Sequence, residues 1–290
     1  MAATIEQITA FYRQTFAYRR RVASAAGSAP LVAQPADCES QWISVTTVEE
    51  VAPDVFRGSG THVNFVLLRD GDALTLIDGG YPGDVAAVDE AIRSLGRRPE
   101  DVQGMLLTHA HVDHMGAIVA FHQRYGIPVF TDSTEVAHAR REYLEQATGK
   151  DFIPMLHKHG VLPWLVRIAL AGATRSVSVN AQALVSGHPV GLPGGPVPVA
   201  THGHTSGHTA FHLPQHGVIV TGDALVTAHP LSKIQGPQLL PPVFDHGHGD
   251  TLEALDRLAG LDAETILPGH GPVISMPIAA AVQQVRERTN

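Results

Sequence analysis

The feature that most constrains this chain is a six-residue run, HAHVDH at residues 109–114, in which four side chains are potential metal ligands. The run follows the apolar segment Met105–Leu107, which predicts a strand over residues 104–108 ending in a tight loop. Such a loop aims the first two histidines to one side and the aspartate and last histidine to another. Imidazole nitrogens and carboxylates are preferred ligands of borderline ions such as Zn²⁺. Because one ion would not use all four side chains well, the run points to more than one ion.

Three later segments carry the same kinds of side chain between glycines and prolines. They are THGHTSGHT at residues 201–209, TGDA at residues 221–224 and LPGHG at residues 267–271. Each segment follows or ends an apolar, strand-like run, and Gly and Pro allow the chain to turn sharply at a strand end. These segments contain the ligands that a second ion would need.

The ordered motifs HxHxDH, GHTxGH, GD and PGHG resemble those of the metallo-β-lactamase-fold superfamily, and the similarity runs from about Val55 to Val273. The resemblance implies an α/β fold, a four-layered αβ/βα sandwich with a helical insertion at about residues 132–180. We expect residues 41–290 to form this domain and residues 1–40 to form an N-terminal helix and connector. Strands and helices recur twice along the chain, as two αβ halves require.

The resemblance also assigns metal ligands residue by residue. It places His109, His111 and His204 on a first metal and Asp113, His114 and His270 on a second, with Asp223 bridging the two ions. No cysteine stands at the bridging position, which favours the glyoxalase II, lactonase and related branches over the β-lactamases that use Cys there. The cofactors implied are two zinc ions, with iron or manganese as alternatives.

The activity implied by this resemblance is that of a metal-dependent hydrolase. A hydroxide held by two zinc ions would attack the carbonyl of an ester, lactone or thioester with an apolar portion. Asp113 is the expected catalytic proton carrier. Three alternatives stay open: a β-lactam hydrolase, a mononuclear iron thiol oxygenase that uses a subset of the ligands, and a non-catalytic metal-binding module of the same fold.

Four other side chains are candidates for the surroundings of the metals. Asp78 ends a strand where members of the family hold a carboxylate that bonds a metal-bound histidine, and His208 follows His204 by four residues. Each has a purely structural alternative, as a turn-forming Asp or a hydrogen-bonded core His. His62 and His229 flank presumed cleft loops, and each either lines the pocket or is a polar residue of its rim.

The segment at about residues 150–180 is unusually apolar, with the large side chains Leu156, Leu162, Trp164, Leu165 and Ile168. Two interpretations are open, a lid that walls an apolar substrate pocket or additional core or dimer contact. Upstream, Asp132-Ser133-Thr134-Glu135 has the spacing of a capping box and predicts a helix to about Ala147.

Composition and charge restrict the partners. The formal net charge of −8 argues against a nucleic-acid partner, since such binders generally present basic surface. The only cysteine is Cys38, so no intramolecular disulfide is expected. The sequence shows neither a secretory pattern nor an apolar run of membrane-spanning length, so we expect a cytoplasmic protein with a small-molecule substrate and no membrane partner. Ile5–Val22 has the periodicity of an amphipathic helix that packs on the domain or on a second subunit, which leaves a homodimer open.

Overall fold

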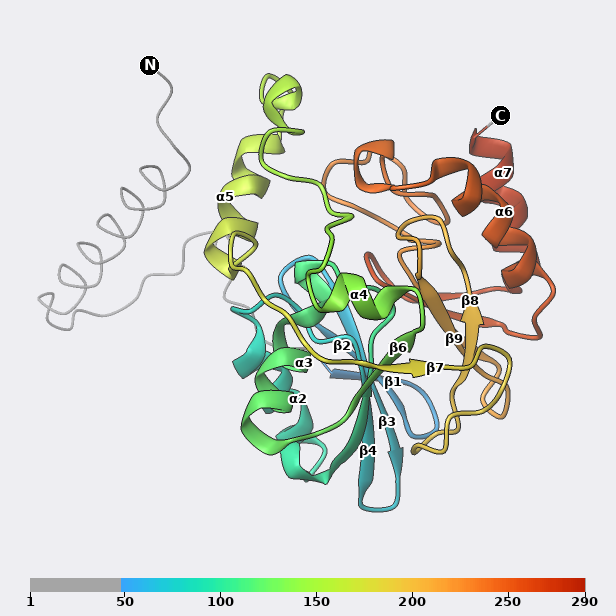
Figure 1. Cartoon of the computed structure of the whole chain (residues 1–290). Coiled ribbons are helices and arrows are strands. Elements are labelled where there is room, and N and C mark those ends of the chain that lie inside the picture. The colour runs from blue at the N-terminus through green and yellow to red at the C-terminus, as the bar shows by residue number, and fades with distance from the viewer. Residues whose placement is uncertain (1–47, 290) are drawn as a thin grey trace, which may run out of the picture.

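The computed structural model describes residues 48–289, and its strands form two sheets (Figure 1). The first sheet has seven strands in the order β1-β2-β3-β4-β5-β6-β7. They are β1 Val48–Ala52, β2 Val55–Ser59, β3 Asn64–Asp70, β4 Ala73–Ile77, β5 Val102–Leu106, β6 Val129–Asp132 and β7 Gln182–Leu184. Strands β1 to β4 pair antiparallel, whereas β4 to β7 pair parallel. The predicted helix Ile5–Val22 and Cys38 lie outside the described residues.

The second sheet has five strands in the order β12-β11-β10-β9-β8. They are β8 Val197–Ala200, β9 Thr209–Leu213, β10 Val218–Gly222, β11 Thr265–Pro268 and β12 Ile274–Ser275. Strands β10 and β11 pair parallel, and the other neighbours pair antiparallel. Within the described residues, the chain completes the first sheet before it begins the second, so the molecule consists of two consecutive halves.

Helices cover the outer faces of both sheets, as Figure 1 shows. Helices α2 (Val85–Ser94) and α3 (Val112–Tyr125) share a buried core with the first sheet. Helices α6 (His248–Ala259) and α7 (Ile278–Thr289) share another with the second sheet, and a third core lies between the two sheets. The order helix, sheet, sheet, helix confirms the predicted four-layered αβ/βα sandwich.

Strand β3 illustrates why apolar residues run without interruption through the first sheet. Phe65 and Leu67 belong to the core under α2 and α3, whereas Val66 and Leu68 belong to the core between the sheets. Since successive side chains of a strand point to opposite faces, a strand buried on both faces needs an apolar residue at every position. Strand β3 pairs antiparallel with β4, so the two form a hairpin.

The connection between β6 and β7 is helical and holds α4 (Glu135–Ala139), the 3₁₀ helix η2 (Ile153–Met155) and α5 (Val161–Ala171). The predicted helix to about Ala147 is wrong, because α4 ends at Ala139. The predicted capping box is wrong as well. Asp132 Oδ1 accepts a hydrogen bond from Thr134 N. The Glu135 carboxylate accepts from Ala110 N, the Thr205 hydroxyl and His138 Nδ1, not from the backbone N–H of Asp132. Two further 3₁₀ helices are η1 (Pro99–Asp101) and η3 (Pro242–Phe244).

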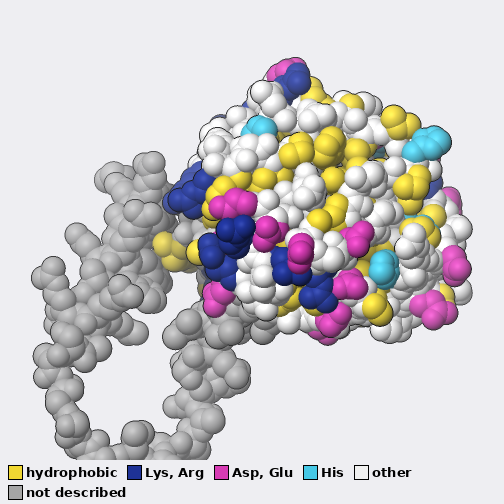
Figure 2. Space-filling view, turned by 90° about the horizontal axis from the view of Figure 1, so that it is seen from below, with side chains coloured by type: hydrophobic (Ala, Val, Ile, Leu, Met, Phe, Trp, Pro, Cys, Tyr) yellow, Lys and Arg dark blue, Asp and Glu magenta, His cyan; other side chains and the backbone are white. Residues whose placement is uncertain are grey.

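The surface carries both signs of charge. On the face drawn in Figure 2, Lys and Arg side chains lie among Asp and Glu side chains. Exposed ion pairs, such as Arg93 with Asp89 at 3.0 Å, join the two signs and contribute little to stability. From residue 48 to residue 289 no helix combines the length and the apolar character needed to cross a membrane.

Candidate metal centre

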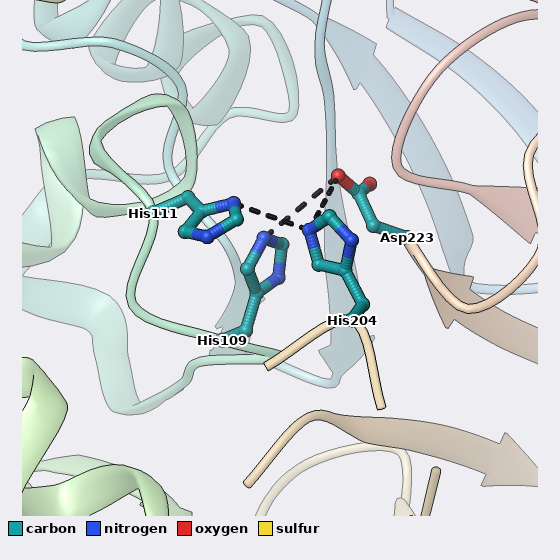
Figure 3. A group of neighbouring side chains, drawn as sticks. All are labelled: His109, His111, His204 and Asp223. Atoms are coloured by element: carbon teal, nitrogen blue, oxygen red, sulfur yellow. Dashed lines mark hydrogen bonds and ion pairs between the residues drawn. The ribbon is translucent and has the colours of Figure 1, made fainter. Parts of the chain in front are cut away.

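All seven predicted ligands lie together at one end of the sandwich, and Figure 3 shows four of them. They come from the loops that follow the carboxyl ends of β5, β8, β10 and β11 and from the first turn of α3. We call them the seven-residue cluster: His109, His111, Asp113, His114, His204, Asp223 and His270. The loops predicted to meet therefore do meet, and none of the seven side chains lies elsewhere.

The cluster divides into two groups of potential ligand atoms. The first holds His109, His111, His204 and Asp223, the second holds Asp113, His114 and His270, and the ligand atoms of each group lie within 4.8 Å of one another.

Asp223 stands between the two groups. Its Oδ2 lies 3.4 Å from His204 Nε2 and 3.2 Å from His270 Nε2, and its Oδ1 lies 3.6 Å from His114 Nε2. This proximity needs Gly269, because a Cβ there would come within 2.1 Å of Asp223 Oδ1.

Asp78 orients histidines of both groups. Its Oδ2 accepts hydrogen bonds from His114 Nδ1 at 2.8 Å and from the Thr108 hydroxyl at 2.8 Å. Because that hydroxyl donates to Asp78, it accepts from His109 Nδ1 at 3.0 Å. The predicted hydrogen bond between Asp78 and a histidine of the site is thus present.

The other three imidazoles are held in the same way, each by an oxygen on the side away from the cluster. These contacts join His204 Nδ1 to Asp245 Oδ1 at 2.9 Å, His111 Nε2 to the carbonyl of Glu145 at 2.5 Å, and His270 Nδ1 to the carbonyl of His62 at 2.6 Å. Sequence analysis did not identify Asp245 or Glu145, since neither stands in a motif. Histidines whose outer N–H is fixed by an oxygen are typical of metal ligands, because this fixes the tautomer and directs the lone pair of the other nitrogen inward.

Three inner atoms have no hydrogen-bond partner among the described residues: His109 Nε2, His114 Nε2 and Asp223 Oδ1. All three are buried, and a buried polar atom without a partner is costly. Divalent metal ions coordinate such nitrogen and carboxylate oxygen atoms. The residues present therefore fit a metal site.

The two groups differ in electrostatics. Burial lowers the pKa of His109 well below the ordinary histidine value. Burial opposes the charge of His114 as well, but nearby carboxylates, Asp78 foremost, raise the pKa of His114 well above that value. In His270 burial is likewise outweighed, mainly by Asp223, and the pKa is raised.

His208 supports the cluster from outside, as one of its two predicted roles required. It is fully buried, and its Nδ1 and the Thr201 hydroxyl lie 2.8 Å apart. Its Nε2 accepts a hydrogen bond from the backbone N–H of Asp223 at 3.0 Å. His208 therefore fixes the backbone that carries the central carboxylate.

Sequence analysis did not identify the role of Glu135, which is fully buried and links two ligand loops. Its Oε1 accepts from Ala110 N and His138 Nδ1, both at 2.7 Å. Its Oε2 accepts from the Thr205 hydroxyl at 2.8 Å and from Gly207 N at 3.1 Å. The acidic residue that suggested a helix cap instead joins the loop of residues 109–111 to that of residues 204–208.

A pocket of about 860 Å³ of empty space, partly open to solvent, adjoins the cluster. Five of the seven side chains line it, namely His111, Asp113, His204, Asp223 and His270. The other side is an apolar wall, a name we use for Phe152, Trp164, Leu165, Ile168 and Phe244. The segment of residues 150–180 thus walls the pocket, as one of its two interpretations proposed.

Two of the apolar residues of that segment take no part in the wall. Leu156 and Leu162 are 45% and 49% exposed, and neither lines the pocket. A helix buries only one stripe of its surface, and on α5 that stripe is Val161, Trp164, Ile168 and Ala171.

His62 and His229 also line the pocket. Burial lowers the pKa of His62 to about 4, with a contribution from Arg167, and lowers the pKa of His229 to about 3, with a contribution from His270. His229 is only 7% exposed, which agrees with the first of its two predicted positions, in the lining of the pocket and not on its rim.

Comparisons with known proteins agree with this geometry. The sequence profile of the family described as the metallo-beta-lactamase superfamily matches residues 58–270. The probable metallo-hydrolase YflN of Bacillus subtilis strain 168 is 28% identical over 217 residues, which cover 69% of this chain and 75% of that protein. The hydroxyacylglutathione hydrolase of Rhizobium meliloti strain 1021 is 23% identical over 168 residues, which cover 56% of this chain and 51% of that protein.

Among solved structures, a metallo-beta-lactamase family protein from Thermus thermophilus is similar with a TM-score of 0.54 and 26% identity. The match covers 78% of this chain and 74% of that chain. The profile match spans more than half of the chain and includes the whole seven-residue cluster. This chain therefore belongs to the metallo-beta-lactamase superfamily and is a metallo-hydrolase of that family.

Proposed function

We propose that this protein hydrolyses a carboxylic ester, lactone or thioester that has an apolar portion, with two zinc ions bound by the seven-residue cluster. The observation that carries the proposal is the pocket, in which one side is formed by five of the cluster's side chains and the other by the apolar wall. Ligand pockets are mostly apolar with a few polar groups that fix orientation. A substrate with a polar reacting group and an apolar remainder matches both sides.

In this proposal the two groups of side chains hold one ion each. His109, His111 and His204 would bind the first ion and Asp113, His114 and His270 the second, and Asp223 would contact both. The distances from Asp223 to histidines of both groups support the bridging role. Iron or manganese would satisfy the same nitrogen and oxygen donors, so the identity of the metal is decided by experiment.

Two such ions, when bound, would lower the pKa of water toward neutrality and polarise a carbonyl oxygen. The chain's own contribution is to move the proton. The Asp113 side chain is 16% exposed in the pocket, and its Oδ2 lies 3.6 Å from His270 Nε2 and 3.9 Å from His114 Nε2. Asp113 Oδ2 would accept the proton of the attacking water and deliver it to the leaving oxygen or sulfur atom.

The apolar wall excludes water from one side of the reacting group and aligns the apolar portion. Phe152 and Trp164 meet edge to face, with ring centroids 5.3 Å apart, and Phe244 lies 6.0 Å from Trp164. A thioester remains within the proposed substrate class because one relative is named a hydroxyacylglutathione hydrolase.

The test combines metal analysis with a substrate screen. Protein loaded with zinc and freed of excess metal should hold about two ions per chain. A panel of aryl esters, lactones, thioesters, β-lactams and phosphodiesters should show hydrolysis of the first three classes, with kcat/KM rising with the apolar area of the acyl group. One iron per chain with oxidation of a thiol, or turnover of β-lactams alone, would contradict the proposal.

A further inference from the structure

One histidine outside the seven-residue cluster lies where the cluster meets the apolar wall. The ring centroid of His229 is 5.4 Å from that of His270 on one side. On the other side it is 4.9 Å from Phe244 and 5.7 Å from Trp164. A substrate that places its carbonyl at the cluster and its apolar portion on the wall must pass this ring.

The hydrogen-bonding character of His229 is set by the backbone. Leu231 N–H donates a hydrogen bond to His229 Nδ1 at 3.2 Å, so Nδ1 presents a lone pair to that N–H. A neutral imidazole with an unprotonated Nδ1 carries its hydrogen on Nε2. Nε2 therefore donates a hydrogen bond and does not accept one.

This donor has no acceptor in the part of the chain that the structure describes. Across residues 48–289, no oxygen accepts a hydrogen bond from His229 Nε2, although the side chain is largely buried and lines the pocket. Tyr81 and Gln146 also line the pocket. The Tyr81 hydroxyl both donates and accepts, and the Gln146 amide, whose Oε1 accepts from Val112 N, has an Nε2 donor of its own. His229 differs from both in its position, because its ring contacts His270 of the cluster and Phe244 and Trp164 of the wall. A donor fixed by the backbone beside an apolar wall can select substrates, because a substrate without an acceptor there would leave it unpaired.

We propose that His229 is a specificity-determining residue, and that its Nε2–H donates a hydrogen bond to an oxygen of the substrate's carboxyl group. The inference rests on the proposed function for the identity of that group. Beyond the proposed function, the role of His229 requires a substrate that combines a carboxyl oxygen near His270 with an apolar portion that reaches Trp164. His229 thus couples the position of the reacting group to the fit of the acyl chain.

The experiment uses two variants of the zinc-loaded, full-length chain. His229→Leu removes the donor and keeps an apolar side chain, and His229→Gln supplies an amide N–H in its place. His216→Leu, in the turn between β9 and β10, is the control for loss of a histidine away from the pocket. The readouts are zinc content, the dissociation constant of hexanoate, and kcat/KM for an ester that the wild-type protein hydrolyses.

Hexanoate binding is read from tryptophan fluorescence in a Trp42→Phe background. The chain has two tryptophans, so Trp164, beside His229, becomes the only reporter. We expect His229→Leu to weaken hexanoate binding about tenfold or more, since a hydrogen bond to a charged oxygen is lost. His229→Gln should stay within about threefold of the wild type, and both variants should keep their zinc.

Hexanoate binding by His229→Leu at the wild-type level, with zinc retained, would overturn the proposal. Loss of zinc from His229→Leu would overturn it too, because His229 would then act as a support for His270. If the wild-type protein hydrolyses no ester, lactone or thioester while hexanoate binding still depends on the donor, the proposed function fails and the role of His229 in carboxyl recognition stands.

Discussion

The seven-residue cluster and the apolar wall face the same pocket but are held in place by different forces. All five imidazoles of the cluster are fixed by a hydrogen bond to a particular oxygen, such as Asp78 for His114 or Asp245 for His204. The wall is held by apolar burial and ring contacts, such as that of Phe152 with Trp164. Hydrogen bonds are directional, whereas apolar packing tolerates changes of shape that conserve volume. Substitutions in the cluster should therefore alter metal binding and chemistry, and substitutions in the wall should alter the choice of substrate.

Replacing Asp113 with Ala should have the largest effect. The change removes both a proposed ligand of the second ion and the proton carrier, so kcat should fall about 100-fold or more while the protein stays folded. Steady-state kinetics together with a thermal melt monitored by circular dichroism would measure this. Wild-type turnover in Asp113→Ala would end the proposed mechanism.

Replacing Asp78 with Asn should weaken metal binding by about 10-fold to 100-fold, because His114 loses the carboxylate that orients it. Competition with a chromophoric chelator measures the affinity. Leu165→Met in the wall conserves approximate volume and serves as the matched control, with unchanged affinity. Equal losses of affinity in the two variants would remove the distinction between cluster and wall.

If the cluster holds the two ions of the proposed function, acidification should release them at different pH values. His114 and His270 have raised pKa values in the metal-free site, so protons compete with the ion of the second group. His109 and His111 have lowered pKa values and are neutral there. As pH falls, each proton that must be displaced weakens binding by about tenfold per pH unit, and the second ion should leave first.

Metal content after dialysis at a series of pH values between about 8 and 5 tests this order. Addition of zinc to metal-free protein at neutral pH should also release protons, detectable with an indicator dye in weak buffer. Simultaneous loss of both ions in one step would contradict the difference between the two groups.

Replacing Trp164 with Ala should have the smallest effect on chemistry. We expect KM for substrates with a large apolar portion to rise by up to about tenfold, with zinc content unchanged, because the variant loses apolar contact with the substrate. Leu162→Ala on the same helix is the control, since Leu162 is 49% exposed and does not line the pocket. A variant that unfolds, or whose KM is unchanged, would make Trp164 a core residue rather than part of a binding surface.

Local sequence patterns determined much of this protein. The apolar runs before the histidine motifs are strands, such as β5 before residues 109–114 and β8 before residues 201–209. The positions of His204, Asp223 and His270 after strand ends could be predicted because glycine and proline mark sharp turns within a few residues. The fold class followed from the resemblance of the ordered motifs to those of the metallo-β-lactamase superfamily. Patterns of this kind involve residues that are close together in the sequence, so they can be recognised without the tertiary structure.

Only the tertiary structure decided which oxygens orient the imidazoles and what the pocket is made of. Asp245 is 41 residues from His204, and the carbonyl of His62 is 208 residues from His270. Spacing within a segment carries no information about such partners, because they meet only when the two halves pack. For the same reason the role of Glu135 could not be predicted. Its spacing matched a helix cap, but its carboxylate accepts a hydrogen bond from Thr205, which is distant in the sequence. Trp164 lines the pocket, whereas Leu162, two residues earlier, is exposed. Both residues are apolar, so the sequence does not distinguish them, and the side of α5 that is buried depends on the segments that pack against it.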